Sequence, residues 1–392
     1  MKLVVISDIH LGKYKYGKIN VQTGLDLRTE DVMSNIDQSI DFAIQKNVDC
    51  FVIDGDFYHK KRPLSIFRKL LASRINRLLT AKIDTFLLLG NHDQGKTSGH
   101  DLTELSEVGD HIENLHTIDT PQIIKVEDTS LYFLPCTNKI DFDRQEHEVE
   151  FNIKTINDFQ KNPHKGKNLF FGHFGTDKSI AGKGFDLGTV VDQDAKYVRV
   201  VPLSTFDPNF WTKVYLGDIH KPQELNAFCR HVGSIARVDF GEEYETKGFY
   251  YYEDGEDQFI QLKDREFKTL EVDLNNDDPR ETMTNFCEKV QDLDLSEAIT
   301  RLKITIRSKD RSLINFDFLE NFLREETWNY IGKGVIEITD KKNEISLDMN
   351  DELNHVEIFK KYIKLMEDKL DKDVLEDALK EGELILSEVL NS

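Results

Sequence analysis

The sequence predicts a layered α+β fold, in which helices flank a core of β-strands. Up to about residue 240, short apolar runs of strand length alternate with longer stretches whose apolar residues recur at helical spacing. The chain has 392 residues and 39% hydrophobic content, which is enough for two or three domains with a sizeable core. These two observations favour a catalytic domain of alternating strands and helices, followed by smaller parts.

The elements of this first part can be placed in order along the chain. Most of the expected strands end at a glycine next to a polar residue, as at Gly55, Gly90, Gly172 and Gly217. Loops at strand ends are where functional side chains tend to lie. The expected strands are 3–6, 50–53, 85–89, 131–134, 168–171 and 213–216, and the expected helices are 32–44 and 65–79.

From about residue 268 the pattern changes to a small βαβαβ unit without a catalytic motif of its own. Its expected strands are 270–274, 302–307 and 334–338, and its expected helices are 279–290 and 316–325. Beyond residue 340 the chain is acidic, and two further helices are expected at about 351–370 and 373–390. An apolar stripe on the first of them must pack either on the chain itself or on a partner, and periodicity does not decide between the two.

Composition limits the classes of function. No stretch reaches membrane-spanning length, and the early apolar run at 3–6 is too short for a signal peptide. The four cysteines lie far apart and form no CxxC pair, so we expect neither a zinc cluster nor disulfides, and a cytoplasmic location (the host cytoplasm if the chain is virus-encoded). The net charge of −21 argues against nucleic-acid binding, unless a basic groove, bound divalent cations or a basic partner offsets it locally.

Side chains with metal-ligand chemistry follow five of the expected strands. Asp8 and His10 stand two apart at the end of the first strand, so both point to the same side of the sheet. Such a pair is a weak signal alone, because most matches are surface residues. The second strand end supplies a carboxylate, which can bridge two ions. The next two supply an amide and an imidazole, and the last supplies an aspartate and a histidine that stand two residues apart. These residues are Asp56, Asn91, His173, Asp218 and His220.

The repetition of apolar strand, glycine and ligand favours a metal site over five unrelated polar residues. Each histidine taken alone would more often be an ordinary surface or core side chain. Mixed carboxylate, amide and imidazole ligands suit Mn²⁺ or Fe²⁺ better than a structural zinc. Two such ions can clamp a phosphate, and His92, next to Asn91, can donate a proton to a leaving oxygen. The expected reaction is phosphoester hydrolysis.

These motifs resemble the calcineurin-like metallophosphoesterase superfamily and, within it, the SbcD nucleases of the SbcCD complex. The stretches that carry the resemblance are 7–12, 55–59 with 62–65, 91–93 and 232–249. It rests on specific motifs up to about residue 262, and beyond that on architecture alone. It implies a four-layer β-sandwich flanked by helices at 1–262, a small α/β capping domain that binds DNA at 268–340, and C-terminal helices at 351–392 that bind an SbcC-type, SMC-like coiled-coil ATPase.

The resemblance also implies roles for single residues. Asp8, His10, Asp56 and His220 would hold one ion, and Asp56, Asn91, His173 and residue 218 the other. His92 matches a catalytic histidine, and His59 a residue that stabilises the transition state. The implied activity is a 3′ to 5′ DNA exonuclease and a single-strand and hairpin endonuclease in DNA end processing, recombination and repair. The implied metal is Mn²⁺, with Mg²⁺ or Fe²⁺ as alternatives, and the implied assembly is a homodimer.

One position departs from the family pattern. The commoner motif is G-H-x-H, whereas this chain has Gly217-Asp218-Ile219-His220. A carboxylate coordinates hard divalent ions well, and its negative charge should tighten binding while weakening the Lewis acidity of the ion. We therefore expect a working site with an altered metal preference.

Two other functions fit part of the pattern. A phosphodiesterase or phosphatase for small molecules would need the same ligands, although it would need neither the capping domain nor the acidic tail. A non-catalytic scaffold would need only the tail, although the presence of His92 argues against it. Lys60, Lys61 and Arg62 follow the second motif, where they either contact a DNA backbone or are simply solvated.

Overall fold

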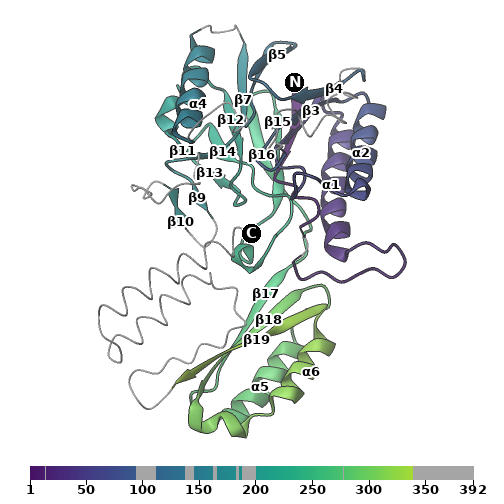
Figure 1. Ribbon diagram of the computed structural model, residues 1–392, viewed down its shortest axis with the longest axis vertical. Coiled ribbons are helices and arrows are strands. Elements are labelled where there is room, and N and C mark those ends of the chain that lie inside the picture. Colours follow the sequence, from purple (N-terminus) through teal and green to yellow (C-terminus); the bar gives the residue numbers. More distant parts are fainter. Residues whose placement is uncertain are drawn as a thin grey trace. The chain divides into compact units, whose positions relative to one another are not determined.

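The computed structural model describes residues 1–13, 15–93, 112–136, 145–161, 166–181, 185–187, 200–276 and 278–338. The chain divides into two compact units (Figure 1). The first comprises Met1–Lys268 with Ser296–Ile299, and the second comprises Thr269–Leu295 with the residues from Thr300 on. The two helices expected at about 351–390 lie outside the described residues.

The first unit contains two six-stranded sheets that share one plan. In each sheet four neighbouring strands are parallel, and antiparallel strands complete the edges. The first sheet has the order β16 (Glu256–Gln261), β15 (Gly248–Glu253), β1 (Lys2–Ser7), β2 (Cys50–Asp54), β3 (Asp84–Leu88) and β4 (Leu115–Ile118). The second has the order β13 (Gln223–Glu224), β14 (Cys229–His231), β12 (Lys213–Gly217), β7 (Lys167–His173), β6 (Thr129–Leu134) and β5 (Gln122–Val126).

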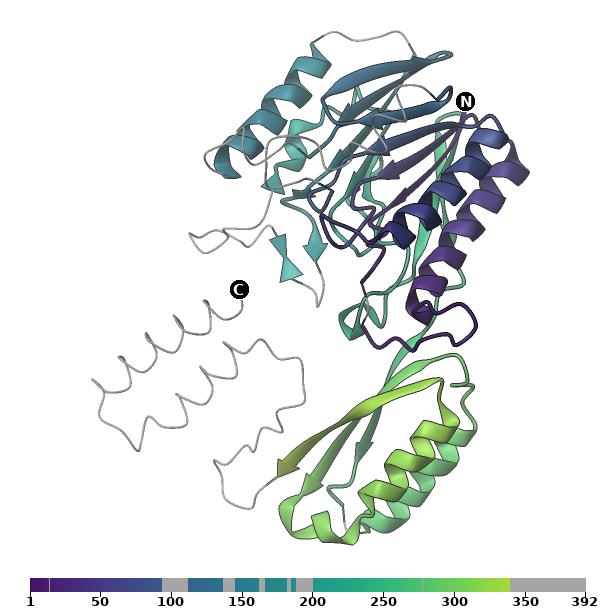
Figure 2. The same ribbon diagram turned by 45° about the vertical axis from the view of Figure 1, so that its right-hand side comes forward.

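The two sheets pack face to face, and helices cover their outer faces (Figure 2). α1 (Leu27–Lys46) and α2 (Ser65–Thr80) pack on the first sheet, and α4 (Gln145–Gln160) packs on the second. Between the sheets the rings of Phe86, Phe133, Phe171 and Tyr215 stack in a row, with neighbouring centroids 5.2, 5.2 and 5.5 Å apart. This arrangement confirms the layered α+β fold. None of the described helices has the length and apolar content that a membrane span requires.

Capping explains why α1 is longer than the expected helix at 32–44. The side chain of Asp26 accepts a hydrogen bond from the backbone N–H of Arg28, which starts the helix at Leu27. At the other end Asn47 adopts a left-handed conformation with φ of 49°, which terminates the helix after Lys46. The apolar periodicity began later than the cap, so the sequence prediction missed the first turn.

α4 was not expected from the sequence at all. Its inner face contains Glu148 and Asn152, which are both buried, between the apolar residues that contact the second sheet. The thiol of Cys136 lies 3.4 Å from a carboxylate oxygen of Glu148. Polar residues at buried positions interrupt the apolar stripe on which the recognition of an amphipathic helix depends.

The second unit has the βαβαβ order that the sequence predicts, in a sheet of order β17-β18-β19. Two helices cover one face of this sheet (Figure 1). Along β18 buried and half-buried residues alternate, which places Leu302 and Ile304 on one face and Arg301 and Lys303 on the other. The bounds are β17 (Phe267–Asp273), α5 (Pro279–Gln291), β18 (Ile299–Arg307), α6 (Phe316–Glu326) and β19 (Asn329–Ile338).

Candidate metal centre

The carboxyl ends of the parallel strands of both sheets meet at one place. Ser7 pairs with Asp54 in the first sheet, Gly217 pairs with His173 in the second, and a bridge between Ser7 and Ser234 joins the two. A Cβ on Gly217 would lie 2.3 Å from Nδ1 of His173 and 2.5 Å from Oγ of Ser7. The loops after β1, β2, β3, β7 and β12 are therefore neighbours, although they come from distant parts of the chain.

Glycine is required at two of the other strand ends because a ligand residue packs against its backbone. A Cβ on Gly55, which has φ of 82°, would lie 2.2 Å from Nδ1 of His173. A Cβ on Gly90 would lie 2.2 Å from Oδ1 of Asp56. The glycine next to each expected ligand thus allows the backbone of one loop to approach the ligand of another.

The backbone of the site is strained. Ten non-glycine residues in the described ranges have a positive φ, and four of them are Asp8, His10, Asp56 and Asp218, at 50°, 46°, 52° and 75°. The left-handed conformation costs a non-glycine residue about 1–2 kcal/mol. Such strain persists where the surrounding structure fixes the conformation, and it is concentrated at functional sites.

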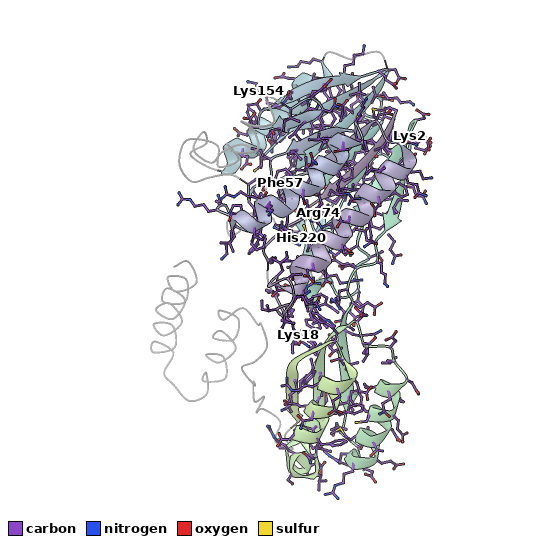
Figure 3. All side chains as sticks on the ribbon, turned by 90° about the vertical axis from the view of Figure 1, so that its right-hand side faces the viewer. Lys2, Lys18, Phe57, Arg74, Lys154 and His220 are labelled. Carbon is purple, nitrogen blue, oxygen red and sulfur yellow. The ribbon has the colours of Figure 1, made fainter. Side chains whose placement is uncertain are left out.

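A first group of ligand atoms consists of one oxygen of Asp8 and the Nε2 atoms of His10 and His220. The two Nε2 atoms are 2.9 Å apart. Oδ1 of Asp8 lies 3.7 Å from Nε2 of His10 and 4.0 Å from Nε2 of His220. Figure 3 labels His220, which belongs to the loop after β12, among the side chains of the first unit.

A second group consists of Asp8, Asp56 and His173, all of them buried. Nε2 of His173 lies 3.5 Å from Oδ1 of Asp56 and 3.8 Å from Oδ1 of Asp8. The other oxygen of Asp56 lies 3.5 Å from Nε2 of His10, which connects the two groups. The resemblance makes Asp56 the only bridging ligand, whereas in the structure Oδ1 of Asp8 also contacts both groups.

The two remaining expected ligands flank these groups. Asn91 is half-buried, and its loop packs on Asp56, because the backbone N–H of His92 donates to Oδ1 of Asp56 at 2.9 Å. Asp218 is also half-buried and acts electrostatically on His173. It lines a cavity of about 410 Å³ together with His220 and Lys13.

Several buried atoms of the site have no hydrogen-bond partner among the described residues. They include Oδ1 of Asp8, Oδ1 of Asn91 and Nε2 of His173. Buried polar atoms are nearly always paired, so a convergent set without partners fits the binding of cations. Divalent ions at this position would supply Lewis acidity to a phosphoester.

The second ring nitrogens of two expected ligands are held by neighbouring acceptors. Nδ1 of His173 donates to the carbonyl oxygen of Asp54 at 2.9 Å, and Nδ1 of His220 donates to Oε1 of Glu242 at 2.8 Å. Such hydrogen bonds fix the ring and leave Nε2 available to a metal, as is typical of metal-binding histidines. The hydrogen bonds around these two histidines therefore also fit a metal centre.

The carboxylates and imidazoles of the site shift one another's pKa values. Burial alone would raise the pKa of Asp56, but the adjacent His173 and His10 hold it well below its usual value. Burial alone would lower the pKa of His173, but Asp56 and Asp8 raise it well above the usual value. A protonated His173 offsets the charge of one of these two carboxylates, and a divalent ion can take the place of its proton.

His92 and His59 lie beside the first group. The His92 ring stands edge-on to that of His10 at 4.9 Å and is stacked on that of His59 at 5.6 Å. Nδ1 of His92 donates to the carbonyl oxygen of His59 at 3.0 Å, while its Nε2 lies 4.0 Å from Oδ2 of Asp56. The side chain of His92 is 36% exposed, so a substrate can reach it. Burial, with added repulsion from Lys13, lowers the pKa of His59 to about 4, so that ring is neutral at pH 7.

The sequence analysis did not assign a role to two residues that support the ligands. Glu242 holds His220, although it lies in one of the motifs that carry the resemblance. Asp93 accepts hydrogen bonds from the backbone N–H groups of Phe57 and Gly90 and so ties two ligand loops together. Burial raises the pKa of Asp93 to about 8. Both residues lie in motifs that carry the resemblance, but the sequence does not show that they support a candidate ligand through hydrogen bonds.

Comparisons with known proteins identify the family of this chain. Residues 1–222 match the calcineurin-like phosphoesterase family. The chain is 25% identical over 295 residues to the SbcD subunit of the nuclease SbcCD from Staphylococcus epidermidis. This alignment covers 70% of this chain and 74% of the relative. It is 31% identical over 96 residues, 24% of this chain and 23% of the relative, to the DNA double-strand break repair protein Mre11 of Sulfolobus acidocaldarius. A solved structure from Thermus thermophilus, that of the protein TT1561, gives a TM-score of 0.39 at 12% identity over 66% of this chain and 98% of that one. Because the family match spans more than half of the chain and contains all the candidate ligands, the chain belongs to the calcineurin-like phosphoesterases.

Proposed function

We propose that this protein is a metal-dependent DNA nuclease that holds two divalent ions, preferably Mn²⁺, at the converging strand ends. The observation that carries the proposal is the buried set of carboxylate, amide and imidazole atoms, three of which lack partners among the described residues. Among phosphoesterases, DNA is the favoured substrate because the Staphylococcus relative, a nuclease subunit, aligns over 70% of the chain. The proposed activities are 3′ to 5′ exonuclease and single-strand or hairpin endonuclease.

In this proposal each ion takes ligands from both sheets. Asp8, His10, Asp56 and His220 hold one ion, and Asp56, Asn91, His173 and Asp218 hold the other. The distance of 3.8 Å between Oδ1 of Asp8 and Nε2 of His173 is short enough for Asp8 to contribute to both. Two ions held by these residues would supply Lewis acidity for the in-line displacement at a phosphoester.

His92 and His59 supply the remaining chemistry. His92 lies beside the candidate ligands with its side chain 36% exposed, so it can supply a proton to the departing oxygen. His59 is neutral, and its ring can donate a hydrogen bond to a phosphoryl oxygen. Lys13, a half-buried cation, lines the adjacent cavity and can attract a phosphate of the same strand.

Local cations can offset the acidic balance of the chain where DNA would bind. Lys60 and Arg62 are exposed in the loop after the second motif, close in sequence to His59. In the second unit, Arg301 lies on the sheet face opposite the buried residues of β18, as does Lys303, which pairs with Glu271 at 3.3 Å. We infer that residues 268–340, most of which belong to this unit, form a capping domain that contacts the DNA backbone.

We further infer a partner and a setting. The apolar stripe of residues 351–370 suits docking on an SMC-like coiled-coil ATPase of the SbcC type, because the similar Staphylococcus protein is a subunit of a complex, SbcCD. The proposed assembly contains two copies of this chain. Its proposed setting is DNA end processing, recombination and repair in a cytoplasm.

The metal proposal predicts that divalent ions stabilise the fold. Adding Mn²⁺ to chelator-treated protein should raise the melting temperature, because at 100 times its Kd a ligand of the native state contributes about 2.7 kcal/mol. Asp56→Asn should remove most of this shift, since Asp56 contacts both ligand groups. Glu256→Gln removes a charge at an exposed position and serves as the control. An equal shift in the Asp56 variant, measured by scanning fluorimetry, would contradict the assignment.

The substrate proposal predicts Mn²⁺-dependent digestion of linear DNA. His92→Gln should lower kcat by about 10²–10⁴-fold while Mn²⁺ binding persists, because it removes only a proton donor. His116→Gln, the same substitution on edge strand β4, should leave the rate unchanged. Hydrolysis of a small chromogenic phosphodiester without DNA digestion would favour the small-molecule enzyme instead. Inactivity with every divalent ion would favour the scaffold.

Position 218 provides a separate prediction. Asp218→His should weaken binding of Mn²⁺ and Mg²⁺ relative to Zn²⁺ and Fe²⁺, because carboxylate ligands favour the harder ions. Asp218→Asn removes the charge but keeps an oxygen, so its metal preference should lie between those of the unsubstituted protein and Asp218→His. The measurement is the activity and affinity of each variant across the four metals. An unchanged order of metals in Asp218→His would show that Asp218 is not a ligand.

The partner proposal predicts the effect of shortening the chain. Deleting residues 351–392 should abolish co-purification with the ATPase, because the apolar stripe lies there. Digestion of single-stranded DNA without the ATPase should remain, since all the proposed ligands precede residue 221. A truncated chain that still binds the ATPase would place the interface elsewhere.

A further inference from the structure

A buried lysine lies behind His220. Lys247 is among the largest fully buried side chains of the described ranges. Its ammonium group lies 2.8 Å from Oε2 of Glu242, 2.8 Å from Oε2 of Glu245, 2.8 Å from Oγ of Ser234 and 3.0 Å from the carbonyl oxygen of His220. An ammonium in a protein interior is costly unless it is paired and hydrogen-bonded, so this arrangement calls for an explanation.

The contacts of Lys247 lead to the ligand histidine by two routes. One is direct, through the carbonyl oxygen of His220. The other passes through Glu242, whose Oε2 is held by Lys247 and by the backbone N–H of Val238 at 3.0 Å. The second oxygen of Glu242 accepts from Nδ1 of His220 at 2.8 Å. Both the backbone and the ring of His220 are therefore fixed by the same cation.

The structure assigns to Glu242 and Lys247 the role of positioning residues for the metal centre. Glu242 keeps the hydrogen of His220 on Nδ1 and turns Nε2 toward Asp8 and His10, while Lys247 keeps Glu242 in place. Outer partners of this kind affect metal affinity by about 10–100-fold. The inference rests on the proposed role of His220 as a ligand.

A purely structural role for the same cluster would have different consequences. If Lys247 only joined the start of β15 to the loop after β12, its loss would lower stability without a specific effect on metal binding. Glu245 separates the two roles, because it contacts the same ammonium at 2.8 Å but makes no described contact with His220. Glu245→Gln is therefore a matched control for Glu242→Gln.

The test is a calorimetric titration of the full-length, metal-free protein with Mn²⁺ in the absence of DNA. Glu242→Gln should weaken the binding event that depends on His220 by about tenfold or more, and Glu245→Gln should leave it unchanged. Lys247→Met should weaken it too and also lower the melting temperature, because it leaves two carboxylates without their partner. If Lys247→Met does not fold, the pair of glutamate variants decides.

A double-mutant cycle shows whether the effect passes through His220. In a His220→Ala background, Glu242→Gln should cause no further loss of Mn²⁺ affinity. An equal loss in both backgrounds, or no loss in either, would overturn the positioning role. If His220→Ala alone left Mn²⁺ binding unchanged, the ligand assignment would fail and this inference with it. Failure of the protein to digest DNA would refute only the nuclease proposal, because the titration contains no nucleic acid.

Discussion

The structure of the first unit depends on the burial of two carboxylates, Asp8 and Asp56, at the point where two sheets meet. A buried carboxylate is stable only when a cation or several hydrogen bonds compensate for the water it has lost. Here the compensation comes from His10, His173 and His220, which surround the two carboxylates. The loops that carry these histidines are fixed by the sheets, so the compensation is built into the fold.

The arrangement of the two sheets explains how candidate ligands that are distant in the sequence come together. In both sheets four parallel strands end on the same side, and one bridge between Ser7 and Ser234 aligns the two ends. The stacked pair of Phe86 and Phe133 joins the two sheets directly, because Phe86 lies on β3 and Phe133 on β6. The candidate ligands thus lie at strand ends, and left-handed residues such as Asp8 and Asp56 turn each side chain inward directly after its strand. The cost of this conformation is met by the packing around it.

Much of this arrangement could be predicted from the sequence because its signals are local. Parallel strands buried on both faces appear as continuous apolar runs, and the residues after them are easily recognised. The apolar periodicity did not reveal α4, because polar residues such as Glu148 occupy buried positions of this helix. The local signals also failed where a residue acts through another, as Glu242 does through His220. The sequence also did not show that Asp8 contacts His173 as well as His10, because this contact depends on the distance between two loops.

Local charges at the site explain how a chain of acidic composition can meet a phosphate substrate. Several carboxylates at the site have nitrogen partners: Asp8 and Asp56 face imidazoles, Glu242 and Glu245 share Lys247, and Asp239 pairs with Lys15. Lys13 is not part of these pairs, and it lines the cavity beside Asp218 and His220. Two divalent ions would add four positive charges next to it. The potential that a phosphate meets is therefore set by these few groups at short range, because charges elsewhere on the surface are screened over about 8–10 Å at physiological salt.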